Sequence, residues 1–204
     1  MRIIAGQFRG RRIRAPVGRD TTRPMTDRVR QSLFDRLTVM QMLGGQVLDL
    51  FSGSGSLGLE SLSREADHCT FVERDATARR VVEQNLQSLD VVGQATILGV
   101  DALNPTWIDA LNPEPVRLVF CDPPYDVTHN AHGALRVARL IEALAPGMEA
   151  DGLLILRTAA QVEPPTAGPD WQGPESHSYG STALHFYRVD PASSARRSGP
   201  TTPD

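Results

Sequence analysis

The sequence lacks lysine altogether and contains only two cysteines, Cys69 and Cys121, among its 204 residues. Two cysteines exclude a disulfide framework and a thiolate zinc site. The five histidines show no spacing typical of ligands, so we expect no metal. No apolar run approaches the ~18 residues of a membrane span, and the apolar stretch at the start is too short for a signal peptide. These absences predict a soluble cytoplasmic protein without a membrane partner.

The charge is unevenly distributed along the chain. All 21 basic residues are arginine, and the formal net charge is −3. Residues 1–36 nevertheless hold ten arginines against three aspartates, so the rest of the chain is strongly acidic. A genome that favours arginine codons would explain the lack of lysine, but it would not explain why the arginines crowd at one end. A basic arm on an acidic body indicates a polyanionic partner for the arm.

Apolar segments and helical periodicity alternate through the body of the chain. Alternating strands and helices predict a mostly parallel sheet covered by helices on both faces. The last two strands, joined at Gly180-Ser181, predict an antiparallel end to this α/β sheet. We expect seven strands, at 46–51, 69–73, 95–98, 116–121, 153–156, 175–179 and 182–188. We expect helices at 56–65, 76–89 and 132–144, and a short one opened by Pro105.

The two ends of the chain differ from this body. Residues 1–15 alternate loosely and predict a short β ribbon, and a helix over 27–42 would be capped by Thr26 or Asp27. The residues after 189 are rich in Pro, Ser, Thr, Gly and Arg and predict disorder. We therefore divide the chain into a basic extension that contacts the substrate, a body and a tail, at residues 1–43, 44–189 and 190–204.

A glycine-rich loop follows the first strand of the body, between Asp49 and Gly58. Its glycines fit the dinucleotide pattern G-x-G-x-x-G, with an acid, Glu73, about twenty residues on. The loop also fits S-adenosylmethionine (SAM), whose ribose takes an acid at the same place. Asp49 favours SAM, because a carboxylate suits an ammonium and a sulfonium but repels a pyrophosphate. A purely structural turn is the third interpretation.

A second motif, Asp122-Pro123-Pro124-Tyr125, follows the fourth strand. Ligands of open α/β sheets bind at the carboxyl ends of the strands, so the motif shares the crevice with the glycine loop. The Asp122 carboxylate and the Pro123 carbonyl suit a planar exocyclic amine, whose two N–H groups they could accept. Tyr125 offers a face on which a flipped base could stack. The structural alternative is a rigid Pro-Pro turn.

Weaker candidates complete the site. Asp101-Ala102 follows the third strand, where adenine contacts would fall. Cys121 could attack a cytosine ring, but neighbouring strand side chains point to opposite faces, so Cys121 and Asp122 should diverge. We therefore predict that Cys121 is a buried, inert thiol.

The chain resembles a known family. The glycine loop followed by Asp122 to Tyr125 is similar to that of the amino-methylating class I methyltransferases. The segment from Arg23 to Phe34, RPMTDRVRQSLF, resembles the N-terminal motif of the bacterial 16S rRNA guanine-N2 methyltransferase family RsmD. Residues 2–6 with 9–11, and 179–184 with 186–187, also resemble that family, over about residues 1–189. Two departures are Met25, where threonine is usual, and Arg157, where an acid is common.

The resemblance implies a Rossmann-like fold, SAM as cofactor and a methyl group placed on N2 of one guanine. It implies that this guanine, expected to be guanine 966, lies in 16S rRNA of the small ribosomal subunit or a late assembly particle. We expect a monomer. The catalytic loop would be Asp122, Pro123, Pro124 and Tyr125. The cofactor would contact Asp49, Phe51, Ser52, Gly53, Ser54, Gly55, Leu57, Glu73, Arg74, Asp101 and Ala102. The RNA would contact Arg9, Arg11, Arg12, Arg14, Arg23, Thr26, Arg28 and Arg30.

Two other functions fit the motifs. The same tetrapeptide would suit methylation of adenine N6 or cytosine N4 in DNA, because it recognises the amine rather than the ring. An RNA-binding factor that has lost catalysis could keep the fold. The intact acid, prolines and tyrosine of the tetrapeptide argue against that loss.

Overall fold

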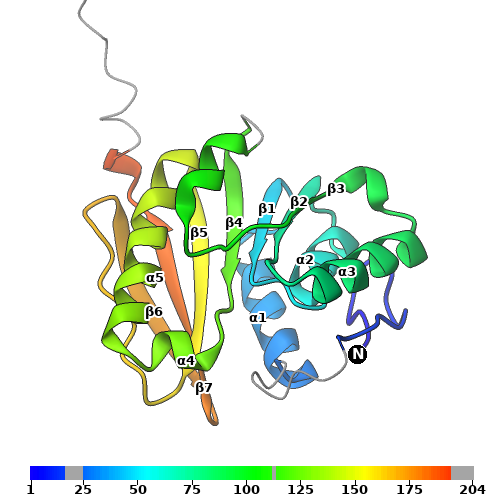
Figure 1. The fold of residues 1–204 in the computed structure, drawn as a ribbon, viewed down its shortest axis with the longest axis horizontal. Coiled ribbons are helices and arrows are strands. Elements are labelled where there is room, and N and C mark those ends of the chain that lie inside the picture. Colours follow the sequence, from blue (N-terminus) through cyan, green and yellow to red (C-terminus); the bar gives the residue numbers. More distant parts are fainter. Residues whose placement is uncertain (17–24, 112–113, 194–204) are drawn as a thin grey trace, which may run out of the picture.

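A mostly parallel sheet forms the centre of the protein (Figure 1), seen in a computed structural model that describes residues 1–16, 25–111 and 114–193. Within these residues the sheet has seven strands in the order β3-β2-β1-β4-β5-β7-β6. Among these seven strands, only β7 runs in the direction opposite to the others. The predicted fold class is therefore confirmed. The strands are β1 (Gln46–Leu50), β2 (His68–Val72), β3 (Ala95–Leu98), β4 (Val116–Cys121), β5 (Met148–Ala159), β6 (Trp171–Tyr179) and β7 (Thr182–Val189).

The helices follow the predicted order, with some different ends. They are α1 (Asp27–Val39), α2 (Ser56–Ser63), α3 (Ala76–Leu89), α4 (Tyr125–Thr128) and α5 (Ala131–Leu144), with 3₁₀ turns η1 (Val92–Gln94), η2 (Pro105–Ala110) and η3 (Ala145–Gly147). The prediction that α1 extends to residue 42 is wrong, because Gln41 takes a left-handed φ of 57° and ends the helical path. The sequence did not predict α4, whose single turn directly follows two prolines.

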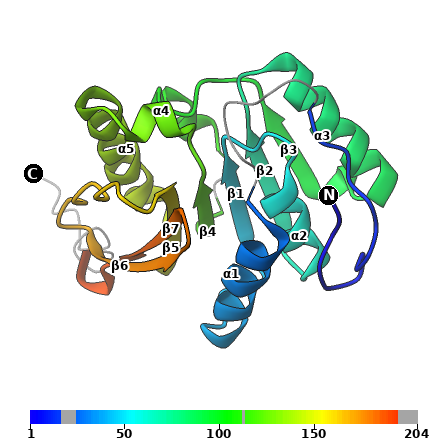
Figure 2. The same cartoon turned by 90° about the horizontal axis from the view of Figure 1, so that it is seen from below.

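Helices cover both faces of the sheet (Figure 2). The strand side chains alternate between two cores. Leu118 and Phe120 of β4 belong to the core formed with α1, α2 and α3. Val119 and Cys121 of the same strand belong to the core formed with α5 and η2. This alternation is expected of a strand with two buried faces. It sends Cys121 and the following residue, Asp122, in opposite directions.

The N-terminal residues are part of this core. The predicted β ribbon of residues 1–15 is reduced to a single antiparallel bridge between Arg2 and Arg12. Ile3 and Ile13 are both buried and join the core beneath α1 and α2. The described part of residues 1–43 is therefore built into the α/β body and does not form a separate unit.

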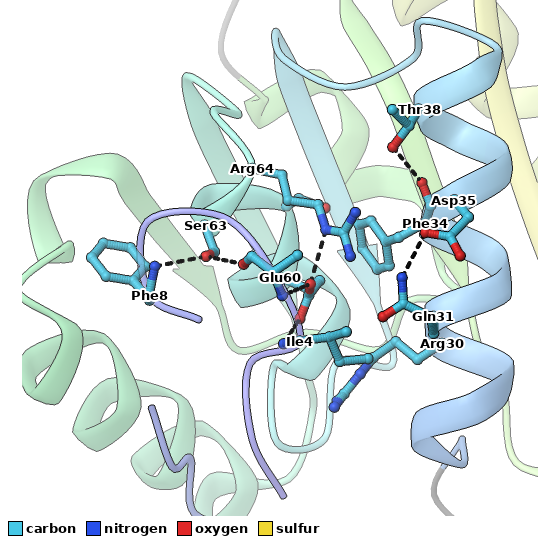
Figure 3. A network of polar contacts seen from close by, with 12 residues as sticks. Ile4, Phe8, Arg30, Gln31, Phe34, Asp35, Thr38, Glu60, Ser63 and Arg64 are labelled. Carbon is cyan, nitrogen blue, oxygen red and sulfur yellow. Dashed lines mark hydrogen bonds and ion pairs between the residues drawn. The ribbon is translucent and has the colours of Figure 1, made fainter. Parts of the chain in front are cut away.

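A buried carboxylate on α2 fastens the N-terminal segment to the body (Figure 3). Glu60 is fully buried. It accepts hydrogen bonds from the backbone N–H groups of Ile4 at 2.7 Å and Ala5 at 3.0 Å, and from Arg64 Nε at 2.9 Å. Ser63 adds a second connection, because its hydroxyl accepts from Phe8 N at 3.0 Å. Since α2 begins at the glycine loop, the arm and that loop are held by one short helix.

We expect Glu60→Ala to lower the free energy of unfolding by about 3–5 kcal/mol, because it leaves the Arg64 guanidinium without its buried partner. Two backbone N–H groups would also lose their acceptor. Chemical denaturation followed by circular dichroism measures the change. The control is Asp35→Ala, which removes an exposed contact with Gln31 Nε2 on α1 and should cost no more than about 0.5 kcal/mol. Equal losses in the two variants would contradict this account of Glu60.

The residues directly after β7 have a defined structure. Asp190 N donates to Asp170 O at 2.8 Å, and Ser193 is buried. The prediction of disorder from residue 190 is thus wrong for residues 190–193, and residues 194–204 lie outside the described part of the chain. None of the described helices is long and apolar enough to span a membrane.

Candidate functional site

A cavity of about 320 Å³ opens at the carboxyl ends of β1, β2 and β4, which is where open α/β sheets bind ligands. Eleven predicted residues line it: Phe51, Ser52, Gly53, Ser54, Leu57, Glu73, Arg74, Asp101, Ala102, Asp122 and Pro124. The other lining residues were not predicted as site residues: Met1, Ala15, Pro16, Met25, Ser56, Val72, Val100, Leu103, Asp126, Val127 and Arg157. The cavity thus joins the glycine loop, the ends of neighbouring strands and the tetrapeptide after β4.

The glycine loop turns sharply between β1 and α2. Gly53 and Gly55 have φ values of 54° and 75°, which favour glycine. Gly58 lies so close to β2 that a Cβ atom would come within 2.5 Å of Cys69 Sγ. The hydroxyl of Ser52 is buried and has no hydrogen-bond partner among the described residues, although Ser52 lines the cavity. An unpaired buried hydroxyl is costly, so this atom points to a ligand that would pair with it.

Glu73 closes one side of the cavity from the end of β2. The residue is 6% exposed. Its Oε2 accepts from Gly53 N at 3.0 Å and its Oε1 from Asp75 N at 2.9 Å. The carboxylate therefore ties the glycine loop to the start of α3, which fixes its position beside the cavity.

Asp49 does not line the cavity, contrary to the expected cofactor contact. It is 2% exposed, and its Oδ2 accepts from Gly58 N at 2.9 Å, in the first turn of α2. Burial raises the pKa of Asp49 well above its usual range. Asp49 occupies an N–H group at the helix end where dinucleotide-binding proteins hold a phosphate. Gly55, at the start of α2, also lies behind the lining.

Asp101, which follows β3, also lines the cavity and is held by two hydrogen bonds. Its Oδ1 accepts from Leu103 N and its Oδ2 from Arg136 Nη2, each at 3.1 Å. No local motif predicts this role for Arg136, because it lies on α5, 35 residues after Asp101. Asp101 and the buried Ala102 form this wall of the cavity.

The tetrapeptide after β4 places Asp122 at the cavity. Its carboxylate Oδ1 accepts from Arg157 Nε at 2.5 Å. Burial raises the pKa of Asp122, and the Arg157 charge opposes that rise. Pro124 lines the cavity, whereas Pro123 is buried and Tyr125 lies outside the lining. The Tyr125 ring is 5.5 Å from the Arg157 guanidinium carbon, so this side of the expected stacking face already has a neighbour.

Cys121 is buried and does not line the cavity. Burial raises the pKa of its thiol, which keeps it protonated. The prediction that Cys121 is buried is confirmed, and chemistry that requires a cysteine thiolate at this position is disfavoured.

The arginines of the N-terminal segment divide into two groups. Arg9, Arg11, Arg12, Arg14 and Arg28 are exposed. Arg30 is fully buried: its Nη2 donates to Arg2 O at 2.6 Å and to Asp27 Oδ1 at 3.0 Å. The prediction that Arg30 contacts RNA is therefore wrong.

The remaining predictions for this segment concern two further residues. Thr26 caps α1, since its hydroxyl accepts from Val29 N at 3.3 Å. Arg23 lies outside the described residues. In the described ranges, no group of three or more His, Cys, Asp or Glu side chains is arranged to hold a metal ion.

Sequence comparison decides the family. The family model described as "Conserved hypothetical protein 95" matches residues 1–188. The chain belongs to this family, the RsmD family of methyltransferases. This chain is 35% identical to the putative rRNA methyltransferase YlbH of Bacillus subtilis over 188 residues, which cover 92% of this chain and 98% of YlbH.

Other relatives agree on family and fold. This chain is 40% identical to ribosomal RNA small subunit methyltransferase D of Escherichia coli K12 over 125 residues. The match covers 61% of this chain and 60% of the relative. The solved structure of yhhF from Escherichia coli has a TM-score of 0.74 at 31% identity, covering 93% of this chain and 98% of that one. The sheet order and these relatives make the RsmD-family chain a class I methyltransferase.

Proposed function

We propose that this chain transfers a methyl group from SAM to the exocyclic N2 amine of a guanine in 16S rRNA, with guanine 966 as the expected target. The observation that carries the proposal is the position of Asp122. Its Oδ1 is held by Arg157, while its Oδ2 has no hydrogen-bond partner within the described part of the chain. Asp122 borders the cavity that the glycine loop and Glu73 also line. A fixed carboxylate with one unused oxygen suits an amine N–H donor.

The residues of the cavity fit SAM better than a dinucleotide. Four carboxylates and two guanidinium groups line it, from Glu73, Asp101, Asp122, Asp126, Arg74 and Arg157. An excess of negative charge favours a ligand that carries an ammonium and a sulfonium and disfavours a pyrophosphate. The buried hydroxyl of Ser52 offers a further polar partner.

Glu73 would hold the ribose hydroxyls, and Asp101 with Ala102 would border the adenine. When bound, SAM would supply the methyl group from its sulfonium and keep the electron pair of the broken S–C bond, while the amine nitrogen would form the new N–C bond and give up one proton to solvent. Asp122 Oδ2 would accept one N–H of the amine and the Pro123 carbonyl the other. These two acceptors would orient a nitrogen whose lone pair is otherwise delocalised into the ring.

The N-terminal segment borders the entrance that a substrate would use. Ala15, Pro16 and Met25 line the cavity, and Arg12 and Arg14 lie nearby in sequence on the same segment. Arg11 and Arg14 donate to Ser88 O and Gln84 Oε1, which places the segment along α3. The exposed arginines would then contact the phosphates of an RNA whose target base reaches Asp122.

We expect Arg9→Ala and Arg12→Ala each to weaken substrate binding and to reduce its salt dependence by about one ion, because each arginine would neutralise one phosphate. SAM binding should not change. Filter binding of small-subunit particles across a salt series measures the slope. The control is Arg139→Ala, an exposed arginine on α5 that lies outside the segment. If both arm variants kept the wild-type slope, the arm would not be the RNA-binding surface.

Methyl transfer to three substrates tests the proposed function. Tritium from labelled SAM should be incorporated into small-subunit particles that lack the mark, and much less into naked rRNA or duplex DNA. The particles come from a strain without this protein. Preferential labelling of duplex DNA would support the DNA amino-methyltransferase instead, and SAM binding with no transfer to any substrate would support a binding factor.

A further inference from the structure

Arg157 occupies a position that the sheet register pairs with the tetrapeptide. Strands β4 and β5 run parallel, and Cys121 lies beside Leu156. The next residue along each strand is Asp122 on one side and Arg157 on the other. The register therefore places a guanidinium and a carboxylate side by side at the edge of the cavity, which both residues line.

The contact between the two side chains is short and sheltered from solvent. Arg157 Nε is 2.5 Å from Asp122 Oδ1, and the two side chains are 4% and 20% exposed. The Arg157 guanidinium carbon also lies 5.5 Å from the centroid of the Tyr125 ring. One arginine thus contacts the first and the last residue of the Asp-Pro-Pro-Tyr loop.

A second contact holds the same loop against the sheet. The Tyr125 hydroxyl is 3.2 Å from Thr182 Oγ1 of β7. Thr182 is paired with Ala159, near the end of β5 that carries Arg157. The loop is therefore held by contacts from the adjacent strands β5 and β7. Of these contacts, the one from Arg157 reaches the Asp122 carboxylate itself.

We propose that Arg157 is a positioning residue for methyl transfer: it holds Oδ1 of Asp122 so that Oδ2 is fixed to accept the target amine. The inference rests on the proposed function, because it assigns Asp122 the task of orienting that amine. Arg157 would not touch the reacting atoms. Its charge would also keep the carboxylate ionised in a buried place.

The ionisation of Asp122 predicts the direction in which the rate of methyl transfer changes with pH. Burial raises the pKa of Asp122 and Arg157 lowers it. An ionised Asp122 is needed as the acceptor, so transfer should fall as the pH drops through its pKa. Within the described ranges, other titratable groups near Asp122 are Asp49, Cys121, Tyr125 and Asp126. Removal of Arg157 leaves these groups in place but takes away the charge that lowers the pKa of Asp122. The acid limb of the pH–rate profile should therefore shift to higher pH.

The test compares Arg157→Met, Arg157→Lys and a matched control, Arg117→Met. Arg117 pairs with Glu149 at 3.0 Å, near the opposite end of the same two strands. Single-turnover transfer to unmethylated small-subunit particles is measured across pH, with SAM affinity and thermal unfolding measured in parallel. We expect Arg157→Met to reduce the rate by about 10²-fold, as for a misplacement of about 1 Å, and to move the acid limb upward.

The lysine variant separates charge from geometry. Arg157→Lys should restore the acid limb, because it keeps the charge, but it should remain slower than wild type, because an ammonium does not reproduce the planar guanidinium contact. Arg117→Met should keep the wild-type rate and pH profile even if it lowers thermal stability. SAM affinity should be nearly unchanged in all three variants.

The outcomes are distinguishable from failure of the proposed function. An inactive wild-type protein would refute that function. An active wild type with Arg157→Met equal or faster, and an unshifted acid limb, would overturn the positioning role alone. If Arg157→Met does not fold, the lysine variant decides: a slower rate at all pH values supports the inference, and a wild-type rate overturns it.

Discussion

Replacement of Asp122 by alanine is expected to reduce methyl transfer by about 10²-fold or more while SAM binding stays nearly intact. That is the scale of loss when one hydrogen-bond partner of a transition state is removed. Asp122 lines the cavity and its Oδ2 is unpaired among the described residues, so the amine would lose its acceptor. Single-turnover transfer to small-subunit particles lacking the mark measures the rate.

Two companion variants make this expectation specific. Asp122→Asn should retain part of the rate, because an amide oxygen can still accept one hydrogen bond. Cys121→Ser should lower stability more than turnover, since it places a hydroxyl in an apolar core. Thermal unfolding distinguishes the two effects. A folded, SAM-binding Cys121→Ser protein without activity, beside an active Asp122→Ala protein, would overturn the amine mechanism and indicate chemistry at a ring carbon.

Replacement of Glu73 by alanine is expected to weaken SAM binding at least about tenfold while the fold persists. Hydrogen bonds to a charged group contribute roughly 1.5–3 kcal/mol each, and Glu73 would make two to the ribose. The variant would also release Gly53 N and Asp75 N, which the carboxylate now holds, and so loosen the glycine loop. Calorimetric titration with SAM measures the affinity.

The control for this variant is Glu83→Ala, an exposed carboxylate on the neighbouring helix α3. It should leave SAM affinity unchanged. Glu73→Gln should fall between alanine and wild type, because one carbonyl oxygen remains to hold the loop. Unchanged SAM affinity in Glu73→Ala would remove Glu73 from the cofactor site, and tighter binding of NADH than of SAM by the wild type would contradict the choice of cofactor.

Local pattern predicted the body of the fold well. Helix α3 and strands β3 and β4 have the bounds that the sequence predicts, because their apolar residues repeat with the period of one element and turn residues or polar residues flank them. Strand β5 is longer than predicted, from Met148 to Ala159. Its first residues, Met148 to Asp151, are mixed in character, and they join the sheet through a register shift beside β4.

The errors arise where burial depends on distant partners. The family resemblance predicts that Arg30 contacts RNA, because Arg30 lies within the N-terminal motif RPMTDRVRQSLF. On α1 it shares the buried stripe with Leu33, Phe34 and Leu37. Its Nη2 donates to the Arg2 carbonyl and to Asp27, whereas its Nε and Nη1 are buried with no hydrogen-bond partner among the described residues. The bond to Arg2 joins residues 28 apart, which helical periodicity cannot reveal.

The candidate site shows the same division. The glycine loop, Glu73 and Asp122 were found from local motifs, because each follows a strand end. Asp49 has the right chemistry for a cationic ligand, but its buried carboxylate accepts from Gly58 N in the first turn of α2 and does not line the cavity. Arg157 was noted only as a departure from a family pattern. Its contact with Asp122 depends on the register between β4 and β5, which no local motif encodes.

Mapping the modified nucleotide tests the central claim most directly. In a strain lacking this protein, 16S rRNA should lose N2-methylguanine at one position, expected to be guanine 966. Wild-type protein should restore the mark, and Asp122→Ala should restore little of it in the same time. Mass spectrometry of rRNA fragments identifies both base and position. Loss of a methyl group from a ring carbon or from DNA, with N2-methylguanine intact, would contradict the account.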